Sequence, residues 1–166
     1  MERHKNGQYI MEDMNPTFLF TWKGVRDRTM DNYHCHDHGE IAFVLSGIGK
    51  YRIEDEVYTI RHQALVNPES GGPTTEFFIG YSDLQLQGLP ANCMPVPEGE
   101  YMLHTAGELR QRLFKICSSM EAEKAVCRQG KYFMLKAYMI QLLLLVIREQ
   151  CEPMEKPQGY AFESAN

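Results

Sequence analysis

The sequence predicts a mainly β fold with C-terminal α-helix, in which a small β-barrel is followed by two helices. Short apolar segments rich in aromatic and β-branched residues alternate with turn residues every 8–12 residues or so through the first 100 residues, which favours a barrel. After Pro95 and Pro97 the apolar residues recur at helical spacing instead. We therefore expect a barrel over residues 1–100, a two-helix segment over 101–152 and a linker over 153–166.

The expected strands are defined by their apolar residues and by the turns between them. Two glycines predict a turn over residues 46–49, and three acidic residues predict another over 54–56. Alternation of polar and apolar residues predicts a last strand over 83–89. The expected strands cover residues 18–22, 41–45, 51–53, 57–60, 64–66, 77–79 and 83–89.

The first helix is expected to begin at a capping box, in which Thr105 and Glu108 bind free amide groups at the helix start. Apolar residues then recur at spacings typical of one helix face, namely Leu109, Leu113, Ile116 and Met120. Such a stripe can face either the barrel or a second subunit, because both require the same spacing.

Gly130 is expected to separate the two helices, and the second helix is expected over residues 131–149. This helix is apolar around most of its circumference, so it should be covered on several sides. One barrel can cover only part of it, which favours a homodimer. We assign Leu109, Leu113, Ile116 and Met120 to the dimer interface.

Charge and cysteine content restrict the possible functions. The chain carries a net charge of −5, so these residues are not expected to bind nucleic acid themselves. Five cysteines without a CxxC spacing suit a reducing compartment. No N-terminal signal is visible, and the longest apolar run, residues 142–147, is far shorter than the roughly 20 residues of a membrane span. We expect a cytoplasmic protein with no membrane partner.

One segment carries a pattern with chemical meaning. His34, His36, His38 and Glu40 occupy alternate positions, which share one face in an extended strand. Two imidazoles and a carboxylate converging inside a barrel can hold a divalent metal ion, or hydrogen-bond one another without any ligand. Because Gly39 is expected to break the alternation, we expect His38 to be a solvent-exposed turn residue.

The spacing His34-x-His36, then Glu40, then Gly47 resembles the first motif of the cupin family, a double-stranded β-helix or jelly-roll barrel. The resemblance has two departures. Arg28 stands where that motif has a glycine, and no histidine follows Pro68, where a metal-binding cupin supplies another ligand. We therefore expect no metal cofactor; any metal would use His34, His36 and Glu40.

The wider pattern from His34 to Gly49, with Tyr58-x-Ile60 and residues 65–68, resembles the N-terminal domain of AraC/XylS-type transcription regulators, over about residues 15–150. The resemblance implies a barrel that binds a small effector, a helical pair that mediates dimerisation, and an attached helix-turn-helix domain that binds DNA. No such DNA-binding half lies within these residues, so we expect the chain to be a fragment ending in the interdomain linker. His62 and Gln63 depart from the Gly-Asp that the family often has.

We accordingly expect a sensor domain rather than an enzyme. The candidate effector-binding residues are His34, His36, Glu40, Trp22, Tyr51 and Tyr58, of which the aromatic residues could instead pack in the core or at the rim. The alternative is a metal-dependent cupin enzyme, a dioxygenase or isomerase, that uses His34, His36 and Glu40. No catalytic triad, P-loop or dinucleotide fingerprint indicates another chemistry.

Overall fold

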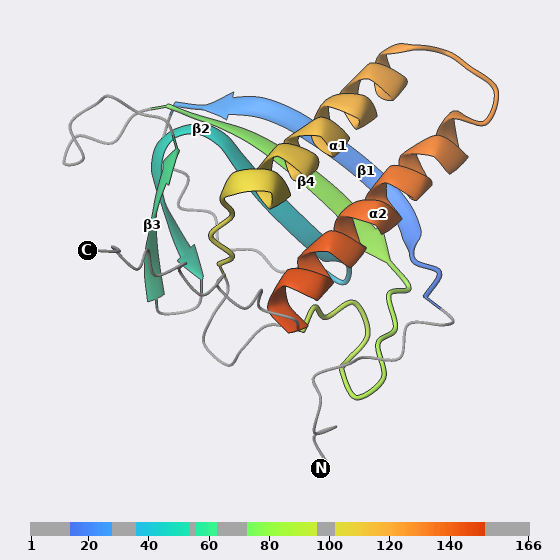
Figure 1. Ribbon diagram of the computed structural model, residues 1–166, viewed down its shortest axis with the longest axis horizontal. Coiled ribbons are helices and arrows are strands. Elements are labelled where there is room, and N and C mark those ends of the chain that lie inside the picture. The colour runs from blue at the N-terminus through green and yellow to red at the C-terminus, as the bar shows by residue number, and fades with distance from the viewer. Residues whose placement is uncertain (1–13, 28–35, 54–55, 63–72, 96–101, 152–166) are drawn as a thin grey trace, which may run out of the picture.

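A computed structural model describes residues 14–27, 36–53, 56–62, 73–95 and 102–151 of the chain. An antiparallel sheet of four strands precedes two helices, which confirms β structure followed by C-terminal α-helix (Figure 1). The strands lie in the order β1-β4-β2-β3, so within the described ranges β1 and β3 form the edges. The elements are β1 (Thr17–Arg26), β2 (Gly39–Ile53), β3 (Glu56–His62), β4 (Thr74–Ser82), α1 (Gly107–Ala125) and α2 (Lys131–Cys151).

Both helices lie across one face of the sheet, in front of β1, β4 and β2 in Figure 1. Side chains alternate between the two faces of a strand, and in β4 the odd-numbered residues Phe77, Ile79 and Tyr81 belong to the core. They are buried together with residues of both helices, among them Leu113, Met120, Met139, Leu142 and Leu143. The core therefore lies between the sheet and the helix pair.

The turn expected over residues 46–49 is wrong, because β2 continues through it to Ile53. β2 pairs with β4 in its first half and with β3 in its second, and its register with β4 shifts between Val44 and Ser46. Gly47 allows this change, since it has a φ of 99° and a Cβ there would lie 2.2 Å from the carbonyl oxygen of Pro73. The glycine redirects the strand instead of ending it.

The strand expected over residues 83–89 is also wrong. Leu84 and Leu86 are fully buried, but no partner strand pairs with them among the described residues. Asp83 has a φ of 58°, which ends β4, and the Leu84 amide donates to the side-chain oxygen of Asn92. The apolar alternation thus reflects burial in the core, without a sheet ladder. The strand expected over 64–66 lies outside the described residues.

Both helices are confirmed, but the start of the first one differs from the expected capping box. α1 begins at Gly107 after an N-cap residue, Ala106, that makes no side-chain capping hydrogen bond. Glu108 is in the first turn, where its negative charge complements the partial positive charge of the helix N-terminus. Gly130 separates the helices with a φ of 80°, as expected. Neither helix is both long and apolar enough to cross a bilayer, as far as the described residues extend.

Candidate functional site

The sheet face that points away from α1 and α2 carries most of the polar side chains of interest. Residues directly opposite each other on antiparallel strands point to the same face. Trp22 pairs with Phe78, which pairs with Ala42, while Phe20 pairs with Gly80, which pairs with Glu40. These positions alternate with the core residues of β4, so they lie on the opposite face. We call this the distal face, and its described members include Phe20, Trp22, Arg26, Glu40, Glu76 and Phe78.

A carboxylate is buried at the centre of the distal face. Glu76 is 1% exposed, its Oε2 accepts a hydrogen bond from Arg26 Nε, and its Oε1 accepts one from the Thr74 hydroxyl at 2.7 Å. The Arg26 guanidinium lies 5.2 Å from the centre of the Phe78 ring and 5.9 Å from that of Trp22. A buried charge is tolerated only when it is paired in this way. The distal face therefore holds a fixed ion pair beside two aromatic rings.

Tyr51 lies close to this ion pair. Its hydroxyl is buried and has no hydrogen-bond partner of normal geometry among the described residues. Burial raises the pKa of Tyr51, and a hydrogen-bonding contact with the Glu76 carboxylate, together with its negative charge, raises the pKa further. The hydroxyl therefore remains protonated at neutral pH and can donate a hydrogen bond to a ligand. Tyr58 is the direct cross-strand partner of Tyr51 on β3, so the two side chains leave the same face.

Two histidines and a glutamate converge where β2 begins. One potential ligand atom from each of His36, His38 and Glu40 lies within 4.8 Å of the other two. The expectation that His38 is a solvent-exposed turn residue is wrong, because its side chain is only 18% exposed and packs edge-on against the Phe20 ring. The chain bends at Asp37 and His38, so the cluster does not need a continuous extended strand. His34 lies outside the described residues.

A cavity of about 390 Å³ adjoins these groups. It lies between β2, residues 102–105 and the two helices, and it reaches both Glu40 and Tyr51. Its volume is within the range of small-molecule pockets, which is roughly 300–1,000 Å³. Its apolar lining includes Phe43, Leu103 and Phe114. The arrangement combines an apolar wall with a few polar groups, which is typical of a small-molecule site.

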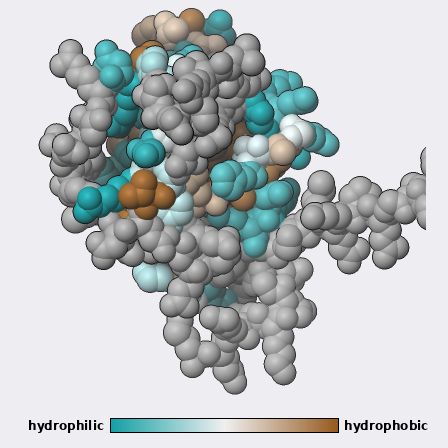
Figure 2. All heavy atoms as spheres, turned by 90° about the vertical axis from the view of Figure 1, so that its left-hand side faces the viewer, coloured by the Kyte–Doolittle hydropathy of each residue, from teal (hydrophilic) through white to brown (hydrophobic). Residues whose placement is uncertain are grey.

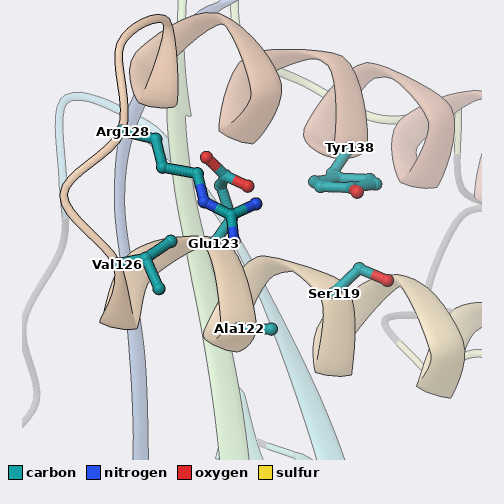
Figure 3. Close-up of a pocket in the computed structure, with 6 residues that line it drawn as sticks. All are labelled: Ser119, Ala122, Glu123, Val126, Arg128 and Tyr138. Carbon is teal, nitrogen blue, oxygen red and sulfur yellow. The ribbon is translucent and has the colours of Figure 1, made fainter.

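A second cavity, of about 300 Å³, lies between α1 and α2 near the loop that joins them. Figure 3 shows the side chains of Glu123 and Arg128 pointing toward each other there, with the Tyr138 ring further along the helix pair. All six side chains that line this cavity are partly or fully exposed. It therefore resembles an open groove more than a site that encloses a ligand.

The helical stripe assigned to a dimer interface is buried within a single chain. Leu113, Ile116 and Met120 are at most 5% exposed, and Leu109 packs against the same core. Side chains that are already buried have almost no surface left for a second copy to cover. The stripe therefore packs inward, against the sheet and α2, and its assignment to a dimer interface is corrected.

Of the sequence-predicted effector residues, Trp22 and Glu40 lie on the distal face, and Tyr51 lies close to its ion pair. Sequence reasoning missed the ion pair and also the place of His38. A signal for Glu76 was present, because it stands two residues before Phe78 in an apolar segment and so shares a strand face with it.

Comparison with known proteins adds no assignment: no protein family, curated protein or solved structure matches this chain.

Proposed function

We propose that this chain is the ligand-sensing domain of an AraC/XylS-type transcription regulator, with a cupin-like barrel. It binds a small effector in the cavity beside β2, which Glu40 of the distal face and Tyr51 both line, and it controls an attached DNA-binding domain. The observation that carries the proposal is the buried Tyr51 hydroxyl, which has no hydrogen bond of normal geometry among the described residues and lies in contact with the Arg26–Glu76 pair. An unsatisfied buried polar group is destabilising unless a ligand pairs with it.

The nature of the surrounding groups supports binding rather than chemical conversion. The Glu76 carboxylate is held by two hydrogen bonds, so it is already occupied as an acceptor. Trp22 is 43% exposed and presents an aromatic surface next to Arg26. Aromatic surface and a few fixed polar groups orient a small molecule without supplying a nucleophile. A sensor also needs different effector affinities in two arrangements, and the cavity contacts both the sheet and the helices.

The effector can be found by a thermal-shift screen of small metabolites, followed by fluorescence titration. Trp22 is the only tryptophan of the chain, so its emission reports directly on ligand at the distal face. We expect Tyr51→Phe to weaken effector binding about fivefold, since it removes one hydrogen bond of about 1 kcal/mol. Tyr138→Phe, a matched change on α2 in the other cavity, should leave the affinity unchanged.

The same titration separates the sensor from the alternative, a metal-dependent cupin enzyme. After incubation with the protein, the effector should be recovered chemically unchanged, as judged by mass spectrometry. Conversion of the compound to a product would favour the enzyme. Equal affinities of the wild-type protein and Tyr51→Phe would remove Tyr51 from the site and, with it, the observation on which the proposal rests.

We also propose that the chain forms a homodimer through the first turn of α2. Tyr132, Phe133 and Met134 are 45%, 74% and 43% exposed, and the rings of Tyr132 and Phe133 pack edge to face at 5.7 Å between centres. The side that carries β3 is a poorer candidate, because the described atoms visible there are mostly hydrophilic and the apolar ones form small separate groups (Figure 2).

In sedimentation experiments, Phe133→Glu is expected to convert the dimer to a monomer, because a charge in an apolar interface is costly to desolvate. Val57→Glu is the matched control, since Val57 is 60% exposed on β3, and it should remain dimeric. A wild-type chain that sediments as a monomer would contradict the dimer but would leave effector binding untouched.

A further inference from the structure

We infer that His36, His38 and Glu40 form a binding site for a first-row divalent metal ion such as Zn²⁺ or Co²⁺. This site goes beyond the proposed effector binding and does not depend on it. The ligand atoms of the three residues lie within 4.8 Å of one another, and the group is unlike the set that the cupin-type motif names, because His38 takes part. Two imidazole nitrogens and one carboxylate oxygen are a ligand set that such ions favour.

The orientation of His38 is the strongest argument for a metal. Its Nε2 atom is buried and has no hydrogen-bond partner among the described residues. Its Nδ1 atom lies 3.3 Å from a carboxylate oxygen of Asp37. A proton on Nδ1 satisfies that contact and leaves the Nε2 lone pair available to a metal. Histidines that bind metals commonly donate their other N–H group to a carboxylate in this way, which fixes the ring.

The neighbouring groups hold the site together. The edge-on contact with Phe20, 5.7 Å between ring centres, supports the His38 ring from the sheet. The rings of His36 and His38 lie 4.5 Å apart between centres and are inclined to each other by 32°. Metal bonds of about 2.1 Å in tetrahedral geometry place ligand atoms about 3.4 Å apart, so the three ligand atoms must approach one another by up to about 1.4 Å. Glu40 is exposed on β2, so rotation of its side chain can supply most of this movement.

Three protein ligands leave at least one coordination position to water or to another oxygen or nitrogen donor. Glu40 also lines the cavity beside β2. An ion held here therefore lies at the mouth of the cavity, where it adds positive charge to a part of the chain that is otherwise rich in acidic residues. Metal binding gives the histidine cluster a function that is separate from effector binding at Tyr51 and the Arg26–Glu76 pair.

The test uses the metal alone, with no effector. The wild-type chain is dialysed against Zn²⁺, freed of unbound ion and analysed for the number of metal ions per chain. A separate titration with Co²⁺, followed by visible absorption, reports the coordination geometry of the bound ion. We expect one ion per chain. His38→Ala and Glu40→Gln should each lower the affinity at least tenfold. Asp37→Ala should lower it about tenfold, because it removes the contact that orients His38.

Glu108→Gln is the matched control for Glu40→Gln, because Glu108 is exposed on α1 and does not belong to the cluster. It should retain full affinity. Glu40→Gln changes an exposed side chain and so remains informative even if His38→Ala does not fold. Less than stoichiometric metal in the wild-type chain, or equal loss of affinity in Glu40→Gln and Glu108→Gln, would overturn the site. Either result leaves the effector proposal standing, because effector binding is measured through Trp22 without metal.

Discussion

Replacing Glu76 with alanine is expected to lower the free energy of unfolding by about 3 kcal/mol. Loss of one partner from a buried ion pair typically costs about 3–5 kcal/mol, because the other charge is left uncompensated. The Arg26 side chain is 34% exposed, so water can solvate it in part and the low end of that range applies. Urea unfolding followed by circular dichroism measures the change.

Two further variants show whether the loss comes from the unpaired charge. Glu108→Ala changes an exposed glutamate in the first turn of α1 and should shift the free energy of unfolding by no more than about 1 kcal/mol. In the double variant Glu76→Leu with Arg26→Met, the unpaired charge is absent, so stability should recover toward that of the wild-type chain. A loss in Glu76→Ala no larger than that in Glu108→Ala would contradict the buried ion pair.

Replacing Leu143 with alanine is expected to lower the free energy of unfolding by about 2–5 kcal/mol. Leu143 is fully buried on α2, within the cluster that joins both helices to the sheet. Its truncation removes apolar contacts and leaves a cavity, and both effects destabilise the folded chain. The measurement is again urea unfolding, with the slope of the transition compared between variants to check that the unfolded state is unchanged.

Val57→Ala serves as the comparison for Leu143→Ala. Val57 is 60% exposed on β3, so this substitution should lower the free energy of unfolding by no more than about 0.5 kcal/mol. Similar losses in the two variants would mean that α2 does not pack as described. The contrast matters for the proposed function, because a signal passed from the sheet through the helices would require the helices to be coupled to the sheet. A loosely packed α2 could not transmit such a change.

Local sequence patterns were sufficient to predict the strands and helices that have the clearest apolar periodicity. The expected strand segments at 18–22, 57–60 and 77–79 lie inside β1, β3 and β4, and the two helices lie where apolar spacing placed them. Each of these signals needs only neighbouring residues, because side-chain periodicity along one element depends on its own backbone geometry. The break at Gly130 was predictable for the same reason, since a left-handed backbone there favours glycine.

Patterns that have two structural explanations led to errors. The glycines of residues 46–49 suit both a turn and a bent strand, and only pairing with β3 and β4 selects the bent strand. The alternation in residues 83–89 suits a strand, but the same leucines can be buried in a segment without a sheet partner. The stripe on α1 suits a dimer interface or the core, and packing against the sheet decides for the core.

The candidate site shows the same division. Spacing along the chain singled out His36 and Glu40 because they are close in sequence. Arg26 and Glu76 are 50 residues apart, and the pairing of β1 with β4 brings them together. The place of His38 depends on a bend and on contact with Phe20, which no local pattern specifies.

The sequence by itself determined the order of β and α elements, the apolar faces of the helices and the unusual density of histidines before β2. Only the tertiary structure decided which face of each element is covered and which polar groups lie together. The physical reason is that element type follows from the local backbone and side-chain period, whereas burial and pairing depend on contacts between residues distant in the chain.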